Sequence, residues 1–262
     1  MAQATHELNT PIDPAGRPAP SPTPGTRQGA LGRKALAEFL GTALLVAAIV
    51  GSGIAAQRLS PGDVGLELLE NALATAAALA VIILAVGPVS GGHLNPVITL
   101  VDRFFGGVST QDALVYVVAQ FAGGVTGAII ANTMFGDTVI SLASRHRASG
   151  PHLFAEAVAT FGLVLVVFGL QRSGGARLVP FAVGAYIGAA YWFTSSTGFA
   201  NPAVAFGRML SNTFAGIAPG STAPFMGFEL LGGALGTGCV AVLYPKFRPG
   251  ARDAAVPQLE DR

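Results

Sequence analysis

Long apolar stretches with almost no charged residues recur between residues 35 and 245. Six of them cover residues 35–56, 72–87, 113–135, 153–170, 178–205 and 224–245. Each is close to the roughly 20 mostly apolar residues that a helix needs to cross the hydrocarbon core of a bilayer. The second stretch is short by itself, but it extends back through residues 65–70. The pattern predicts an all-α membrane protein with six transmembrane helices.

The composition agrees with a membrane protein and argues against several other classes. Hydrophobic residues make up 51% of the chain and charged residues only 11%, whereas a soluble domain carries about 25% charged residues. The net charge of +1 gives no strong attraction to nucleic acid. No nucleophile–base arrangement or phosphate-binding loop is recognisable, and the four histidines are scattered. We therefore predict neither an enzyme nor a bound metal or cofactor.

The two halves of the apolar region resemble each other. Three pairs of segments correspond in the same order, Ala37–Thr42 with Ala155–Thr160, His93–Val97 with Phe199–Ala203, and Gln120–Gly124 with Glu229–Gly233. We therefore divide the region into repeat one (residues 35–135) and repeat two (residues 151–245). Three spans in each half insert the second copy upside down, and such an inverted repeat places a shared site near the middle of the membrane.

An Asn-Pro pair opens a short potential helix in each repeat. The first box is Asn95, Pro96 and Val97, and the second box is Asn201, Pro202 and Ala203. Asparagine is a favourable N-cap and proline suits the first position of a helix, but the stretches that follow are too short to span a bilayer. Each box therefore predicts a re-entrant half-helix, and the inverted repeat makes the two half-helices meet at their N-termini.

Two facing helix N-termini create a positive potential and supply hydrogen-bond donors at the place where they meet. Each carries about half a positive charge from its aligned peptide dipoles, which opposes the passage of cations, including protons. The side chains of Asn95 and Asn201 can each present an amide donor there. A water or hydroxylated solute that accepts both donors is oriented, which interrupts a proton-conducting chain. The boxes thus predict passage of uncharged molecules without leakage of charge.

The sequence from Ser90 to Val97, Ser-Gly-Gly-His-Leu-Asn-Pro-Val, resembles the first signature of the aquaporin, or major intrinsic protein, family, and the second box resembles the second signature. The resemblance covers residues 35–244. It implies six spanning helices and two half-helices around one pore per subunit, in a homotetramer. It also implies a passive channel for small uncharged solutes, with residues 35–245 as the channel domain. Val97 departs from the usual alanine, so we expect slightly altered packing beside the pore.

The segments outside the channel domain are predicted to be tails. Residues 1–34 are rich in proline, lack the apolar core of a cleavable signal peptide and are expected to form a disordered tail. Residues 246–262 form a second, polar tail. The chain is predicted to cross the plasma (inner) membrane several times, with both tails in the cytoplasm. This orientation places eleven Lys and Arg residues inside, where these residues accumulate. The four left outside are Arg58, Arg145, Arg147 and Arg208.

Two glutamates occupy equivalent places near the start of the two repeats. The resemblance implies that Glu38 and Glu156 accept hydrogen bonds from the re-entrant loops and brace them. The rival interpretation is an ion-coupled secondary transporter with inverted repeats, in which these acids carry protons. Symmetric placement beside the loop motifs favours bracing. His93 is expected to brace its loop, with a pH gate as the weaker alternative, and Glu229 either pairs across a helix interface or faces a polar cavity.

In the family that the chain resembles, four positions line a constriction, and one is normally an arginine directly after the second box. Counted from the boxes, these positions fall at Thr75, Ala189, Gly198 and Val204, all small or apolar. The resemblance therefore implies a wide filter without arginine, similar to a bacterial subgroup that is linked in part with arsenic handling. Water, glycerol, urea and neutral metalloid hydroxides such as arsenous acid are the expected solutes. If the register slips, the aromatic residues Tyr191, Trp192 and Phe193 refill some of this space. Arg208 is expected near the outer end of its half-helix.

Overall fold

The computed structural model describes residues 24–245, which form helices and loops but no strand. The helices are α1 (Pro24–Leu59), α2 (Val64–Ser90), α3 (Pro96–Phe105), α4 (Thr110–Met134), α5 (Gly150–Arg172), the 3-10 turn η1 (Ala176–Leu178), α6 (Val179–Phe193), α7 (Pro202–Arg208) and α8 (Pro219–Leu243). The predicted tail at residues 246–262 and most of the tail at residues 1–34 lie outside the described residues. The part of the first tail that is described is helical, because α1 begins at Pro24 and residues such as Ala30 and Leu31 favour a helix.

Among the described helices, α1, α2, α4, α5 and α8 are long and apolar enough to cross a membrane. α6 is shorter, with 15 residues, and η1 precedes it directly. α6 ends at Phe193, because Thr194 adopts an extended backbone conformation. The apolar stretch 178–205 thus contains a short sixth helix, a loop and the first turn of α7.

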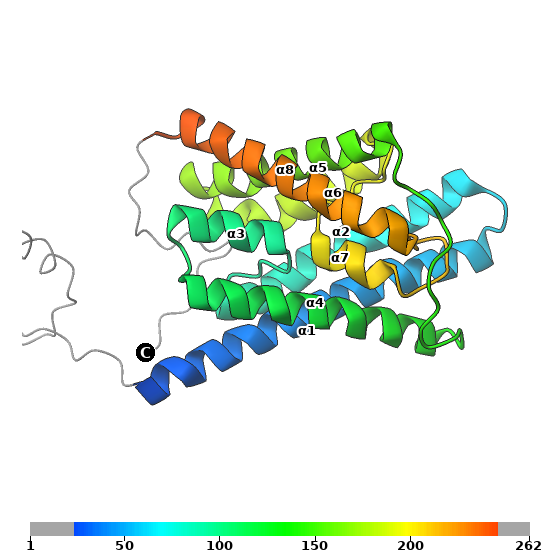
Figure 1. The fold of residues 1–262 in the computed structure, drawn as a ribbon, viewed down its shortest axis with the longest axis horizontal. Helices are drawn as coiled ribbons and strands as arrows, with labels where there is room; N and C mark the ends of the chain where they lie inside the picture. The colour runs from blue at the N-terminus through cyan, green and yellow to red at the C-terminus, as the bar shows by residue number, and fades with distance from the viewer. Residues whose placement is uncertain (1–23, 246–262) are drawn as a thin grey trace, which may run out of the picture. The chain divides into compact units, whose positions relative to one another are not determined.

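α3 and α7 are the two half-helices expected from the Asn-Pro boxes, with 10 and 7 residues. Asn95 caps α3 by accepting a hydrogen bond from the backbone N–H of Val97, and Asn201 caps α7 in the same way through Ala203. Both half-helices pack against α4 and α8. Figure 1 shows α3 and α7 following one another roughly end to end among the long helices.

Glycines let pairs of helices approach closely at equivalent places in the two repeats. A Cβ atom on Gly123 of α4 would overlap the carbonyl oxygen of Phe39 in α1, and one on Gly232 of α8 would overlap that of Ala157 in α5. Lipid is as apolar as the helix surface, so membrane helices associate through close packing of small residues rather than through hydrophobic burial. The matching α1–α4 and α5–α8 contacts are those that an inverted repeat requires.

Val97, which departs from the family pattern, packs against α8 and not into the pore. Its Cγ1 occupies the space that a Cβ atom on Gly233 would need, and the residue is buried. The missing side chain at position 233 therefore compensates for the extra volume at position 97.

We expect Gly233→Ala to destabilise the protein by roughly 1–3 kcal/mol, because overpacking a filled contact forces neighbouring atoms apart. In a Val97→Ala background the same change should cost much less, since the methyl groups that it meets are gone. Unfolding of the four proteins in detergent measures the coupling. Equal losses in both backgrounds would show that the two residues do not compensate each other.

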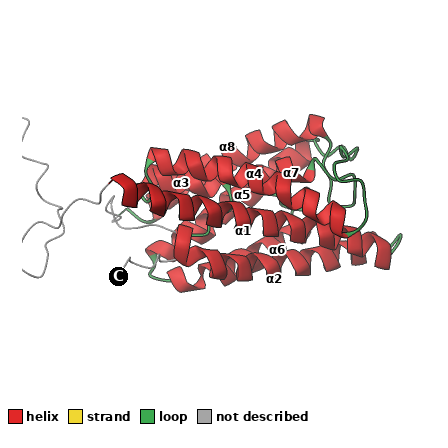
Figure 2. Cartoon of the chain, turned by 90° about the horizontal axis from the view of Figure 1, so that it is seen from below, coloured by secondary structure: helices red, strands yellow, loops and turns green. Residues whose placement is uncertain are grey.

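Residues 135–149 and 209–218 form the long-loop end of the protein, at the right of Figure 2. Backbone hydrogen bonds join the two loops, with the N–H of Ala143 donating to the carbonyl of Met209 at 2.9 Å and the N–H of Ala218 donating to the carbonyl of Arg145 at 2.8 Å. These bonds fix the loop that carries Arg145 and Arg147 over the C-terminal end of α7.

Candidate functional site

The two Asn-Pro boxes meet and hold each other. The side-chain amide of Asn95 donates to the carbonyl oxygen of Ala200 at 2.7 Å, and that of Asn201 donates to the carbonyl oxygen of Leu94 at 2.8 Å. Each asparagine donates one N–H of its side-chain amide to the opposite loop, so its second N–H can donate to a ligand. Both asparagines line the same internal cavity. The structure therefore brings together the two residues that the duplicated sequence pairs.

The loops before the boxes turn in the same unusual way. Leu94 and Ala200 have φ angles of 51° and 49°, in the left-handed region that residues other than glycine rarely adopt. Gly92 and Gly198 have φ angles of 61° and 58° two residues earlier. Gly198 is thus the counterpart of Gly92 and shapes the loop, and it does not line the cavity. Such strained turns persist only where the surroundings hold them.

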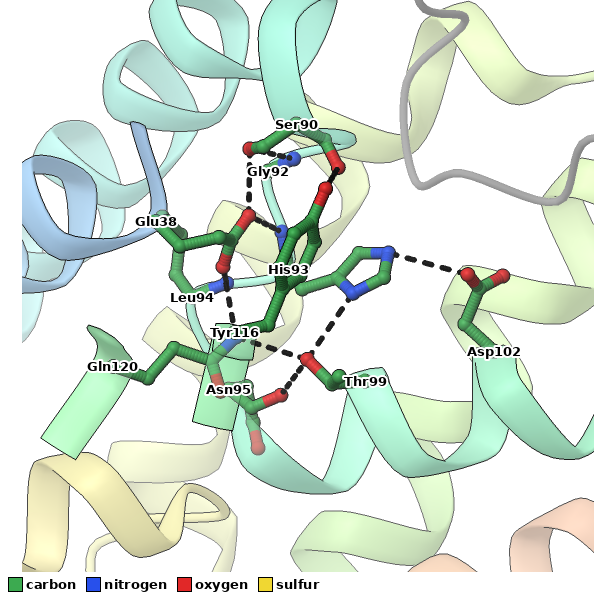
Figure 3. A network of polar contacts seen from close by, with 10 residues as sticks. All are labelled: Glu38, Ser90, Gly92, His93, Leu94, Asn95, Thr99, Asp102, Tyr116 and Gln120. Carbon is green, nitrogen blue, oxygen red and sulfur yellow. Dashed lines mark hydrogen bonds and ion pairs between the residues drawn. The ribbon is translucent and has the colours of Figure 1, made fainter. Parts of the chain in front are cut away.

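Glu38, which is fully buried, holds the first loop in place (Figure 3). Its carboxylate accepts hydrogen bonds from the backbone N–H groups of His93 at 3.0 Å and Leu94 at 2.7 Å. The hydroxyl of Ser90 donates to it at 2.6 Å, and the amide of Gln120 in α4 donates at 2.8 Å. These four donors offset the cost of burying a carboxylate at membrane depth.

Glu156 holds the second loop through the equivalent bonds. Its carboxylate accepts from the backbone N–H groups of Phe199 at 3.0 Å and Ala200 at 2.8 Å, and the hydroxyl of Ser196 also bonds to it. Ser196 stands where Ser90 stands in the first repeat. The inverted repeat is therefore preserved at the level of single hydrogen bonds around each loop.

Glu229 occupies the position that Gln120 has in the first repeat. Its role, left open by the sequence, is visible here: it is fully buried, accepts from the backbone N–H of Asn201 at 3.2 Å and lies within hydrogen-bonding reach of Glu156. Gln120 donates to Glu38 through a neutral amide, whereas two ionised carboxylates side by side and away from water would repel each other strongly. Two buried neighbouring carboxyl groups are therefore favoured in the form in which they share one proton.

The side chain of His93, in the first re-entrant loop, contacts two residues of α3 (Figure 3). Its Nδ1 lies 3.1 Å from the hydroxyl of Thr99, and its Nε2 lies 3.5 Å from the carboxylate of Asp102. Sequence reasoning missed Asp102, but comparing the repeats beyond the boxes points to it. Asp102 stands at the position of the first half-helix that matches Arg208 in the second, so the two half-helices carry opposite charges at equivalent places.

A narrow cavity of about 50 Å³ runs past both boxes. One water molecule needs on the order of 10–15 Å³ of such volume, so the cavity has room for a few water molecules. Its polar side chains are those of Thr75, His93, Asn95 and Asn201, and the rest of its wall is mostly aliphatic. The aliphatic residues are Leu45, Ile49, Leu79, Ile83, Leu94, Ile98, Leu163, Val167, Val179, Val183, Ile187, Ala200 and Val204. A few donors in an apolar wall orient a small solute without binding it tightly.

Two of the four residues assigned to the filter, Thr75 and Val204, line this cavity. Ala189 does not, because it lies on the exposed side of α6. Ile187 lines the cavity instead, and Tyr191, one helical turn further, places its hydroxyl 3.0 Å from that of Thr75. Positions 187 and 191 share one helix face and position 189 points away from it. Tyr191, and not Ala189, is therefore the side chain of α6 that reaches Thr75.

Comparisons with known proteins agree with this architecture. A family model described as Major intrinsic protein matches residues 26–233. The chain is 43% identical over 225 residues to the aquaglyceroporin AqpS of Rhizobium meliloti (strain 1021), covering 86% of this chain and 96% of that protein. It is 33% identical over 185 residues to the aquaporin TIP1-2 of Zea mays, covering 67% of this chain and 73% of that protein. Its fold matches the X-ray structure of the aquaglyceroporin from Plasmodium falciparum with a TM-score of 0.62 at 21% identity, covering 82% of this chain and 96% of that one. The chain belongs to the major intrinsic protein family.

Proposed function

We propose that the chain is a passive channel for small uncharged solutes. The observation that carries the proposal is the pair of facing asparagines, since Asn95 and Asn201 cap half-helices from opposite repeats and line one cavity. Facing helix N-termini repel cations, and two fixed amide donors orient a hydroxylated solute. An ion-coupled secondary transporter is not favoured, because Glu38 and Glu156 are engaged by loop amides and do not line the cavity.

The proposed solutes are water, glycerol-like polyols and neutral metalloid hydroxides such as arsenous acid. The filter that we propose lies between Thr75, Tyr191 and Val204 and carries no arginine. Its two hydroxyl groups and its aliphatic side chain suit a molecule with hydroxyls along one edge and carbon–hydrogen groups along the other. The similarity to a protein named as an aquaglyceroporin supports this class of solute.

We also propose an orientation and an assembly. The long-loop end faces the outside of the cell, and both tails lie in the cytoplasm, because this places most Lys and Arg residues inside. The protein assembles as a homotetramer in the plasma (inner) membrane, with one pore in each subunit. Phe181, Trp192 and Phe193 are among the large apolar side chains that are more than half exposed and would contact lipid or a neighbouring subunit. Cysteine labelling from either side and native mass spectrometry test these two points.

Stopped-flow light scattering of proteoliposomes tests the channel function directly. We expect flux of water, glycerol and arsenous acid with a low activation energy, without saturation and without dependence on a proton or sodium gradient. Flux that saturates and follows an ion gradient would instead identify a coupled transporter. Liposomes that shrink no faster than protein-free ones would contradict any channel function.

Asn201→Asp should lower glycerol flux about tenfold or more and raise proton leak, because a negative charge between the half-helices cancels their barrier to cations. Aspartate can still accept from the N–H of Ala203, but it cannot donate to the carbonyl of Leu94. Asn212→Asp is the matched control, since Asn212 lies at the long-loop end and accepts from Ser144. Unchanged flux and unchanged leak in Asn201→Asp would refute the role of the boxes.

A further inference from the structure

Three arginines surround a second cavity at the long-loop end. Arg145 and Arg147 come from the loop before α5, and Arg208 comes from the last turn of α7. The cavity has a volume of about 110 Å³, and its other lining residues are Val64, Leu68, Asn71, Tyr191, Thr197 and Phe214. It adjoins the pore cavity, because Tyr191 in its wall contacts Thr75 in the wall of the pore.

None of the three guanidinium groups is paired with a carboxylate within residues 24–245. Their hydrogen-bond partners are backbone carbonyl oxygens, of Phe214 for Arg145, of Gly216 and Phe214 for Arg147, and of Ala215 for Arg208, at 2.5–3.1 Å. The fourth arginine at this end, Arg58, differs because it pairs with Asp137 at 2.8 Å. Carbonyl oxygens orient the three groups around the cavity but leave each of them without a carboxylate in an ion pair.

Arg208 connects this charge to the pore. It is buried, and its guanidinium group lies 3.5 Å from the centre of the Phe199 ring, which belongs to the second re-entrant loop and lines the pore cavity. Its Nε donates to a carbonyl, whereas its two terminal nitrogens donate to no residue that the structure describes. Glu156 and Glu229 also act on Arg208, but their carboxyl groups hold loop amides and neither forms an ion pair with it.

An anion would relieve the repulsion inside this cluster. Burial first, and then the charges of Arg208 and Arg145, lower the pKa of Arg147 to about 9, so this group stays charged at neutral pH against the repulsion of its neighbours. A negative ligand reverses the sign of that interaction in a partly enclosed site, where charges act strongly. Planar guanidinium groups bind oxyanions through paired hydrogen bonds. Asn71 and Thr197 add neutral polar groups to the same wall.

We propose that the cavity between Arg145, Arg147 and Arg208 binds a small oxyanion, such as a short carboxylate or inorganic phosphate, and that the bound anion blocks exchange of neutral solutes with the pore. The binding site stands independently of the pore, whereas the block rests on the proposed channel function. Its occupant would lie beside Tyr191 and Arg208, where the two cavities adjoin.

Isothermal titration of the purified full-length protein with inorganic phosphate, in a low-chloride buffer at neutral pH, tests the site. We expect saturable binding, about tenfold weaker in Arg145→Gln and only about two- to threefold weaker in Arg145→Lys, because lysine keeps the charge but loses the paired hydrogen bonds. Arg145 is exposed, so its replacement should leave the fold intact, which a melting curve verifies. Arg58→Gln is the control for general surface charge and should bind as the wild type does. Equal binding by the wild type and Arg145→Gln, or an equal loss in Arg58→Gln, would overturn the site.

Glycerol flux into proteoliposomes equilibrated with phosphate on both sides tests the block. Phosphate should slow the flux of the wild type, and the half-blocking concentration should rise about tenfold in Arg145→Gln, in step with its weaker binding. Saturable binding with no slowing of flux would refute the proposed block but not the proposed binding site. Absence of glycerol flux in every variant, even without phosphate, would refute the proposed channel function, and the titration would still decide whether the anion site exists.

Discussion

Val204→Arg is expected to lower the flux of glycerol and arsenous acid about tenfold or more while water flux falls by only a few-fold. Val204 lies in the first turn of α7 and lines the pore cavity, as Thr75 does. A guanidinium group there fills space beside Tyr191 and holds a shell of water that a larger solute must displace. Stopped-flow measurements of the three solutes on the same proteoliposome preparation give the ratio of the fluxes directly.

Val204→Leu separates the effect of volume from the effect of charge. Leucine adds bulk at the same position without a charge, so it should lower glycerol flux less than arginine does and leave water flux almost unchanged. The amount of folded protein in each preparation is matched before the rates are compared. Glycerol and metalloid fluxes that are the same in the wild type and in Val204→Arg would place the constriction elsewhere.

Features set by composition or by repetition could be predicted from the sequence. The apolar stretches define the long helices, and a buried Asn-Pro pair has few uses other than to begin a helix. The meeting of the two Asn-Pro boxes then follows from the duplication. The face of α6 that lines the pore could not be predicted in this way. Residues 178–193 are apolar on every side, so no polar stripe indicates which positions turn inward.

The filter position on α6 was assigned to the wrong residue because the inward face of this helix could not be predicted. Counting back from the second box selects Ala189, but the result depends on how many residues the loop between α6 and α7 uses to turn. This loop spans residues 194–201 and contains Thr197 and Ala200 with positive φ angles, which no propensity of these residue types predicts. Tyr191 therefore places its hydroxyl against Thr75 in the wall of the pore cavity, and the proposed filter gains a hydroxyl group.

Differences between the repeats were harder to interpret than their similarities. Aligning Gln120–Gly124 with Glu229–Gly233 shows that a neutral amide in one repeat matches an acid in the other. The sequence does not show that both side chains turn toward the loop carboxylates, because this depends on the rotation of α4 and α8. That rotation is set by glycine contacts with α1 and α5, which exist only in the folded protein.

Glu229→Ala should disrupt both stability and flux, whereas Glu229→Gln should preserve both. Alanine leaves the N–H of Asn201 without its acceptor and Glu156 without its neighbour, at a cost of roughly 1–3 kcal/mol for each buried group. Glutamine can accept from Asn201 with its oxygen and donate to Glu156 with its amide, as Gln120 donates to Glu38 in the first repeat. Melting temperature in detergent and glycerol flux in proteoliposomes measure the two effects.

The comparison of these two variants also separates bracing from proton transfer. A bracing role needs a donor and an acceptor at position 229, and glutamine supplies both without titrating. A proton carrier needs a group that gains and loses a proton, and glutamine cannot replace it. If Glu229→Gln folds normally but abolishes flux, the shared proton takes part in transport. This result would support the ion-coupled secondary transporter over the passive channel. If it conducts like the wild type, Glu156 and Glu229 act only by holding Asn201 and its loop in the shape of the pore.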